Sequence, residues 1–248
     1  MAKIIFLGTN GWYDSETGNT ISILIDAEQY GVVLDAGYGI SKLIKCMKSD
    51  KPVYLFISHF HIDHIAGMHT LAMNSFSKGL FVLVQEGGTE LLNRIMSAPY
   101  TIPLEELPFM STILEVPQNA GRLPFKAEFL QLDHTGTTLG ARLMIDGKVI
   151  TYCPDTGYCS NAVKLAREAD LLITECAFRP GESSSAWPHL NPETAARIAK
   201  EAKVKRLALT HFDAQRYDSL QHRQEAEIKA KLTFENSCIT TDGMVIDL

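Results

Sequence analysis

The chain has 248 residues, of which 46% are hydrophobic and 21% are charged, and its formal net charge is −6. This composition is typical of a globular protein, and no apolar run approaches the ~20 residues of a membrane-spanning helix. The acidic balance disfavours an extended nucleic-acid surface, which is normally basic. Five unpaired-looking cysteines and the lack of a signal-peptide pattern predict a cytoplasmic protein without structural disulfides.

Short apolar segments bounded by Gly, Asp, Asn or Pro are predicted to be strands, at residues 3–8, 20–26, 31–37, 53–58, 80–85, 111–116, 127–132, 141–146, 148–153, 171–175, 206–210 and 244–248. Helical patterns lie between some of them, at residues 39–48, 63–76, 89–96, 162–168, 192–202 and 214–231. No linker interrupts the pattern. We therefore expect one α/β domain over residues 1–248, with hairpins as well as crossovers in its sheets.

Two strand–turn–strand segments, residues 21–37 and 141–157, resemble each other, and both end in Asp-x-Gly at Asp35 and Asp155. The second turns at Asp146-Gly147, which is a strong hairpin signal. Two explanations stay open. The similarity is either a chance likeness of two hairpins or the mark of a duplicated half-domain whose two similar sheets face one another.

The stretch SHFHIDH, residues 58–64, follows an apolar strand and is rich in metal-ligating side chains. Alternation along an extended segment places His59 and His61 on one side. Asp63 and His64 begin the next helix, whose start can direct them elsewhere. Such a set suits two metal ions better than one, and it is too dense to be explained as an ordinary polar loop.

A histidine or aspartate follows an apolar strand at three more places, namely His134, Asp155 and His211. Singly, each has a structural explanation, such as a hydrogen-bonded histidine at a strand end or an Asx turn at Asp155. If these strands lie side by side, their carboxyl ends converge on one crevice. The sequence therefore predicts a metal site there.

The pattern His-x-His-x-Asp-His, followed by a His, an Asp and a His at later strand ends, resembles the metallo-β-lactamase fold superfamily. The resemblance spans nearly the whole chain and implies a four-layer αβ/βα sandwich, with two mixed sheets face to face and helices outside. It implies that one metal binds His59, His61 and His134, that a second binds Asp63, His64 and His211, and that Asp155 bridges both. Asp35 corresponds to a structural hydrogen-bonding residue near the site.

The stretch WPHLNPETAARIAKEAKVKRLALTHF, residues 187–212, is similar to the ribonuclease Z-like phosphodiesterases and makes His189 their extra active-site histidine. The alternative for His189 is a loop histidine beside Trp187. The long tRNA-gripping arm of ribonuclease Z is missing, because only twenty residues separate His134 from Asp155. We therefore expect a dinuclear-metal hydrolase that acts on a small or cyclic phosphodiester.

Three alternatives remain: a thioesterase or lactonase of the glyoxalase II type, a tRNA 3′-processing endonuclease, and a non-catalytic metal-binding regulator. We expect Asp63 and His189 to be the catalytic residues and two divalent ions to be the cofactors. The donor set favours Zn²⁺, with Mn²⁺ or Fe as alternatives. The expected partner is a small-molecule substrate, and the similar phosphodiesterases are frequently homodimers.

Several other residues are assigned lesser roles. His69 is expected to be structural, His222 to be solvated on a charged helix, and Cys153 and Cys159 to be small buried hydrophobic residues. Glu175 either supports a ligand by hydrogen bonding or solvates the rim of the crevice. The apolar segment 100–110 is a lid, a dimer contact or part of the core.

Overall fold

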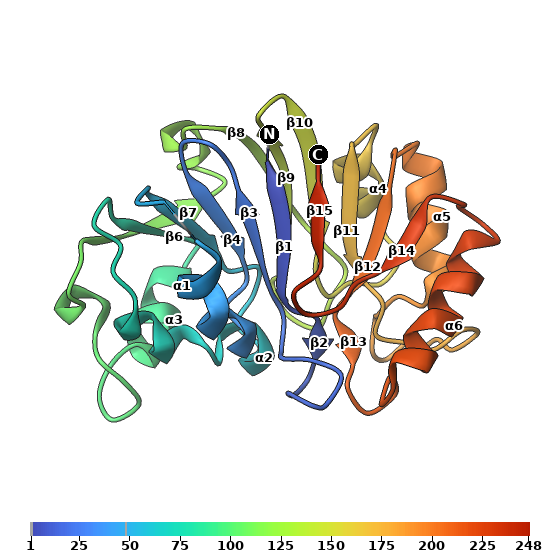
Figure 1. Cartoon of the computed structure of the whole chain (residues 1–248), viewed down its shortest axis with the longest axis horizontal. Helices are drawn as coiled ribbons and strands as arrows, with labels where there is room; N and C mark the ends of the chain where they lie inside the picture. The colour runs from blue at the N-terminus through green and yellow to red at the C-terminus, as the bar shows by residue number, and fades with distance from the viewer. Residues whose placement is uncertain (1, 48) are drawn as a thin grey trace.

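Two mixed β-sheets face each other in the middle of the molecule, with helices on both outer sides (Figure 1). The computed structural model describes residues 2–47 and 49–248. Within these residues, seven strands form one sheet in the order β15-β1-β3-β4-β5-β6-β7, and six form the other in the order β14-β12-β11-β10-β9-β8. This is the four-layer αβ/βα sandwich that the resemblance predicts.

The first sheet carries the strand that leads into the histidine-rich segment. Its members are β1 (Lys3–Gly8), β3 (Ser22–Asp26), β4 (Gly31–Leu34), β5 (Val53–Phe56), β6 (Leu80–Gln85), β7 (Ser111–Val116) and β15 (Val245–Asp247). Strands β4 to β7 run parallel, whereas β3 is antiparallel to both β1 and β4. Every residue of β4 and β5 is buried, which explains their uninterrupted apolar sequences.

The second sheet brings three strand ends to one edge. It contains β8 (Lys126–Gln131), β9 (Leu139–Ile145), β10 (Lys148–Cys153), β11 (Leu171–Glu175), β12 (Leu207–Thr210) and β14 (Ser237–Ile239). The predicted turn between β9 and β10 is confirmed, and both Asp146 and Gly147 have positive φ. Because β10, β11 and β12 run parallel, their carboxyl ends meet at one edge of the sheet.

A short pair of strands, β2 (Asn10–Gly11) and β13 (Phe212–Asp213), connects the two halves of the chain. These two strands and β14 were not predicted. The first two have only two residues each, and β14 has three, so no hydrophobic period can develop in them.

Helices cover the outer faces of both sheets: α1 (Leu43–Cys46), α2 (Ile62–Ile65) and α3 (Gly88–Ile95) lie beside the first, and α4 (Ser160–Ala166), α5 (Pro192–Ala202) and α6 (Leu220–Lys231) beside the second (Figure 1). Short 3₁₀ helices are η1 (Tyr38–Lys42), η2 (Met68–Met73), η3 (Leu104–Glu106) and η4 (Ala120–Arg122). Helix α5 has the predicted bounds, with the Asn191 side chain accepting from Thr194 N–H.

Helices α3 and α4 begin one and two residues before their predicted starts, and three other predicted helices differ more in extent. The helix expected at residues 63–76 is divided into α2 and η2, because Gly67 packs its backbone against Gly37 at the division. The helix expected at 214–231 begins only at Leu220, since Ser219 caps it. The helix expected at 39–48 is a 3₁₀ turn followed by α1, and Lys48 lies outside the described residues.

Three clusters of buried apolar side chains hold the layers together. One fills the space between the sheets, where the Phe56 and Phe129 rings lie 5.2 Å apart, and the other two join each sheet to its helices. Residues 100–110 are mixed, since Leu104 and Leu107 are buried while Tyr100 and Met110 are exposed. Among the described residues, no helix combines the length and apolar character needed to cross a membrane.

Candidate metal centre

The seven predicted ligand residues come from five segments and converge at the carboxyl ends of the strands. His59 and His61 lie in the loop after β5, and Asp63 and His64 lie in α2. The others follow strands of the second sheet: His134 after β8, Asp155 after β10 and His211 after β12. Their nitrogen and oxygen atoms form two groups, within each of which all atoms lie within 4.8 Å of one another.

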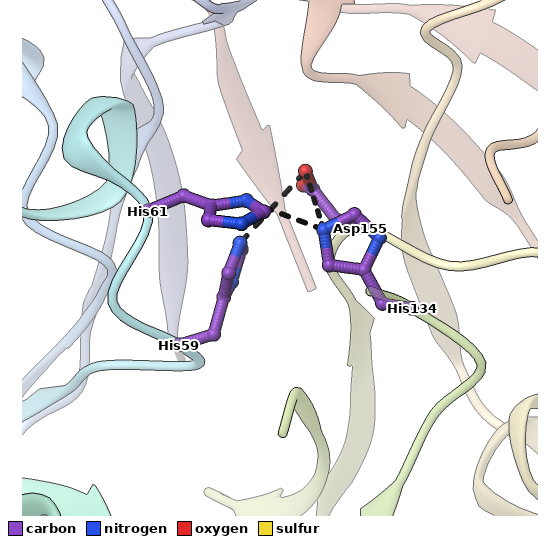
Figure 2. A group of neighbouring side chains, drawn as sticks. All are labelled: His59, His61, His134 and Asp155. Carbon is purple, nitrogen blue, oxygen red and sulfur yellow. Dashed lines mark hydrogen bonds and ion pairs between the residues drawn. The ribbon is translucent and has the colours of Figure 1, made fainter. Parts of the chain in front are cut away.

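The first group consists of His59, His61, His134 and Asp155, whose side chains point toward one another (Figure 2). His61 Nδ1 and His134 Nε2 are 3.3 Å apart. Asp155 Oδ2 lies 3.7 Å from His134 Nε2 and 3.9 Å from His59 Nε2. Three imidazoles and one carboxylate thus surround a common point.

The second group consists of Asp63, His64 and His211. His64 Nε2 and His211 Nε2 are 3.0 Å apart, and His211 Nε2 is 3.2 Å from Asp63 Oδ2. Asp155 Oδ1 lies 3.0 Å from His64 Nε2 and 3.2 Å from His211 Nε2. One oxygen of Asp155 therefore faces each group, which is the arrangement that a bridging carboxylate requires.

Asp35 and Ser58 orient two of these imidazoles from behind. Asp35 is fully buried, and its carboxylate accepts from Ser58 N–H at 2.7 Å, Ser58 Oγ at 2.8 Å and His64 Nδ1 at 2.8 Å. Since the carboxylate accepts a hydrogen bond from His64 Nδ1–H, Nε2 is the nitrogen that faces the second group. Ser58 Oγ lies 3.0 Å from His59 Nδ1, so Nε2 of His59 also faces the group.

Burial and charge act in opposite directions on the histidines. Burial lowers the pKa of His59 and His134, which keeps these rings neutral. Burial also opposes protonation of His64, but Asp155, Asp35 and Asp63 outweigh it and raise the pKa of His64 well above its usual range. Burial raises the pKa of Asp155, but the attraction of His211 and His64 outweighs it and lowers this pKa well below its usual range. The surrounding carboxylates thus favour a positive charge at His64, and a divalent ion bound at its Nε2 would supply one in place of a proton.

The donor set fits two divalent metal ions. Five imidazoles and two carboxylates are ligands that Zn²⁺ prefers. The buried atom His59 Nε2 has no hydrogen-bond partner in the described part of the chain. Two pairs of imidazole nitrogens, His64 Nε2 with His211 Nε2 and His61 Nδ1 with His134 Nε2, approach each other to 3.0 and 3.3 Å. The assignment of these residues as ligands remains a prediction, and the geometry fits it.

His189 lies next to the cluster and is held by a buried carboxylate. Its Nδ1 is 2.6 Å from Oε1 of Glu175, and its ring contacts the His134 ring at 5.1 Å between centroids. Glu175, at the end of β11, also accepts from Thr156 N–H and Ala177 N–H. Burial lowers the pKa of His189, but Glu175 outweighs this and raises it to about 9. Glu175 is fully buried and so does not solvate the rim, and its hydrogen bonds go to His189 and two backbone N–H groups, with none to a predicted ligand.

A cavity of about 260 Å³ opens beside the cluster and is lined by Asp63, Asp155, His189 and His211, among others. Trp12, Ile62, Ala177 and Trp187 line it as well, and sequence analysis assigned no role to these four residues. Trp187 could have been predicted as a site residue, because it lies two positions before His189 in the sequence. Nothing in the sequence indicates that Trp12 lies at the site, because its position there depends on the pairing of β2 with β13.

Two histidines set aside from the sequence lie away from the two groups. His69 is exposed, contacts the carbonyl of Ala66 through Nδ1 and packs beside Tyr38. His222 pairs with Asp218 on α6. Cys153 is buried, as expected, whereas Cys159 is only half-buried.

The sandwich and its two His/Asp groups define a metal-dependent hydrolase with a metallo-β-lactamase fold. The chain belongs to this superfamily: the family model described as "Beta-lactamase superfamily domain" matches residues 31–212, well over half of the chain. The recognition made from the His-x-His-x-Asp-His pattern is thereby confirmed, and the chain is a metallo-hydrolase of this family.

Relatives of known sequence or structure agree with this assignment. The chain is 28% identical to the "Probable metallo-hydrolase YhfI" of Bacillus subtilis, over 85% of this chain and 86% of that protein. It is 25% identical to a ribonuclease Z of Metallosphaera sedula, over 91% of this chain and 93% of that protein. The crystal structure of YhfI superposes over the full length of both chains with a TM-score of 0.81 and 25% identity.

Proposed function

We propose that this protein is a dinuclear metal-dependent phosphodiesterase that acts on a small or cyclic phosphodiester. The observation that carries the proposal is the position of His189, which is held by Glu175 at 2.6 Å and lines the same cavity as Asp63, Asp155 and His211. A proton donor therefore stands beside a metal-binding cluster, which is what cleavage of a phosphodiester with a poor leaving group requires.

The relatives support phosphodiester chemistry. Several are ribonucleases Z, which match this chain over most of their own length. The small size of the substrate is supported by the segment between His134 and Asp155. It holds only the β9–β10 hairpin, with no inserted arm to grip a large nucleic acid.

The ions proposed here are Zn²⁺, with Mn²⁺ or Fe as alternatives for the same ligands. His59, His61 and His134 would hold one ion, Asp63, His64 and His211 the other, and Asp155 both. Two divalent ions bound there would act as Lewis acids that activate a water molecule and neutralise charge on the phosphate oxygens.

Two side chains of the protein, Asp63 and His189, have separate roles in the proposed reaction. Asp63 Oδ2 accepts a 2.7 Å hydrogen bond from Trp12 N–H, which holds the carboxylate in place on the cavity wall. His189 donates Nδ1–H to Glu175, so its Nε2 is the nitrogen that can protonate the departing oxygen. Glu175 raises the pKa of His189 to about 9, which favours the protonated imidazole that a general acid requires.

A panel of substrates tests this proposal. The metal-reconstituted protein is assayed with aryl phosphodiesters, cyclic nucleotides and short RNA ends, and in parallel with a glutathione thioester and an acyl lactone. We expect turnover of phosphodiesters only. Strong turnover of the thioester or lactone without phosphodiester cleavage would reverse the order of the two candidates. Less than one metal ion per chain after gentle purification would favour a non-catalytic role.

A tRNA 3′-processing endonuclease is the second candidate, because ribonucleases Z are prominent among the relatives. The net charge of −6 and the missing arm argue against it. Cleavage of a precursor tRNA with an efficiency above that of every small diester in the panel would establish it.

A further inference from the structure

Trp12 and Trp187, the two tryptophans of the chain, lie against each other at the metal-centre cavity. Their ring centroids are 5.4 Å apart, with a 57° angle between the planes, and Trp12 is 58% exposed. We propose that these two rings form an aromatic wall that binds a planar aromatic group of the substrate, such as a nucleobase. This inference rests on the proposed function and names its substrate class.

The backbone at Trp12 is strained and is held beside the candidate metal centre. Trp12 has φ of +71°, and Tyr13 N–H donates to the Gly11 carbonyl at 3.0 Å, which together define a γ-turn centred on Trp12. A bulky residue rarely adopts positive φ, and such strain persists only where the surroundings impose it. Here the hydrogen bond from Trp12 N–H to Asp63 Oδ2 does so, and it ties the ring's position to a proposed metal ligand.

Trp187 extends the wall toward the proposed proton donor. Its ring packs edge-on against His189, with centroids 4.7 Å apart, and against Phe178, with centroids 5.9 Å apart. A ring bound on the wall would therefore lie on the His189 side of the phosphate. The aromatic group of the substrate is thus expected on the alcohol that departs.

Charge and size narrow the class of substrate. Among the described residues that line this cavity there is no Lys or Arg. Arg216, in the neighbouring cavity beyond the tryptophans, is paired with Glu182 and Asp213. The residues that line this cavity therefore provide no unpaired Lys or Arg side chain to bind the further phosphates of a polyphosphate or a long nucleic acid. The volume of about 260 Å³ is also at the low end for ligand sites, so it suits one small group beside the phosphate.

The arrangement of the rings favours a planar group over a quaternary ammonium group. Proteins bind quaternary ammonium inside cages of several aromatic rings. Trp12 and Trp187 contact each other and present one wall, which Ile62, 73% exposed, continues with apolar surface. A nucleobase needs only one face on which to stack.

The test compares two ligands that differ only in the base. The metal-loaded protein is titrated with adenosine 5′-monophosphate and with ribose 5-phosphate, and binding is followed by the intrinsic fluorescence of the tryptophans. We expect the nucleotide to bind about 5- to 100-fold more tightly than the sugar phosphate. Trp12→Ala and Trp187→Ala should each remove most of this difference between the two ligands. Trp12→Phe and Trp187→Phe should retain much of it.

Tyr100→Ala is the matched control, because Tyr100 is an exposed aromatic residue that lines neither cavity. Equal affinities for the two ligands in the unmodified protein would overturn the proposal, and so would tighter binding of phosphocholine than of the nucleotide. If the nucleotide shows its base-dependent advantage but no phosphodiester is hydrolysed, the wall stands and the proposed activity fails. If diesters are hydrolysed but the nucleotide binds no more tightly than the sugar phosphate, the proposed activity stands and the aromatic wall fails.

Discussion

Tyr152 Oη donates a 2.7 Å hydrogen bond to Asp35 Oδ2, and both residues are fully buried. Tyr152 belongs to β10 of the second sheet, whereas Asp35 follows β4 of the first. The same carboxylate accepts from His64 Nδ1, so the orientation of a proposed metal ligand depends on both sheets. These two residues also come from the two similar Asp-x-Gly hairpins, which the structure places in opposite sheets.

Replacing Tyr152 by Phe should lower the free energy of unfolding by about 1.5–3 kcal/mol, because it removes a buried hydrogen bond to a charged group. Urea denaturation of the metal-free protein measures this. Tyr54→Phe is the control, since Tyr54 is buried in the same inter-sheet core and its hydroxyl has no hydrogen-bond partner within residues 2–47 and 49–248. An equal loss in both variants would mean that the Asp35 contact contributes nothing beyond packing.

Gly11→Ala should displace His211 and reduce metal binding. A Cβ added at Gly11 would lie 2.5 Å from His211 Cε1 and within 2.9 Å of both ring nitrogens. The proposed second ion should be lost preferentially, because His211 belongs to its group. Elemental analysis after dialysis is expected to show about one ion per chain where the unmodified protein holds two. Gly121→Ala, where an added Cβ meets nothing within 4 Å, should keep both.

His189→Ala should keep both ions and lose about 10²–10⁴-fold in kcat, the usual contribution of a positioned proton donor. Its side chain is 3% exposed and contacts His134, but it belongs to neither group of predicted ligands. Kinetics on a phosphodiester and elemental analysis of the same sample check both halves of the prediction. Loss of an ion would show instead that His189 is itself a ligand.

The pKa of His189 in the metal-free protein should be about 9, since Glu175 outweighs the effect of burial. Because this lies above the value of about 6.5 in an unfolded chain, the stabilisation is complete below pH ~6.5 and disappears as the pH rises through about 9. The stability difference between the unmodified protein and His189→Gln should shrink over that range. NMR titration of the imidazole gives the pKa directly, and Glu175→Gln should lower it. A value unchanged by Glu175→Gln would contradict the pairing.

Removing the metal should lower the thermal stability as well as abolish activity. An ion that binds only the folded chain stabilises it by about 4 kcal/mol at a thousandfold excess over its dissociation constant. Calorimetry before and after chelation should therefore show a fall in Tm, which added Zn²⁺ or Mn²⁺ reverses. A Tm unaffected by chelation would mean that the His/Asp groups hold no ion in the folded protein.

Local patterns predicted the long elements well. Helix α5 and the β9–β10 turn follow directly from Asn191, Pro192 and Asp146-Gly147, because caps and turns depend on neighbouring residues. The helix expected at 63–76 was wrong in its middle, since the contact of Gly67 with Gly37 is tertiary. Strands β2, β13 and β14 were missed because each forms only by pairing with a strand that is distant in the sequence.

The types and order of the predicted metal ligands can be read from the sequence, because His59, His61, Asp63 and His64 lie within six positions and the rest follow apolar strands. Three relationships become visible only in the folded chain: which oxygen of Asp155 faces which group, the hydrogen bond between Glu175 and His189, and the position of Trp12 at the cavity. Those relationships join residues from different strands and loops, so they depend on how the two sheets pack and on no local pattern.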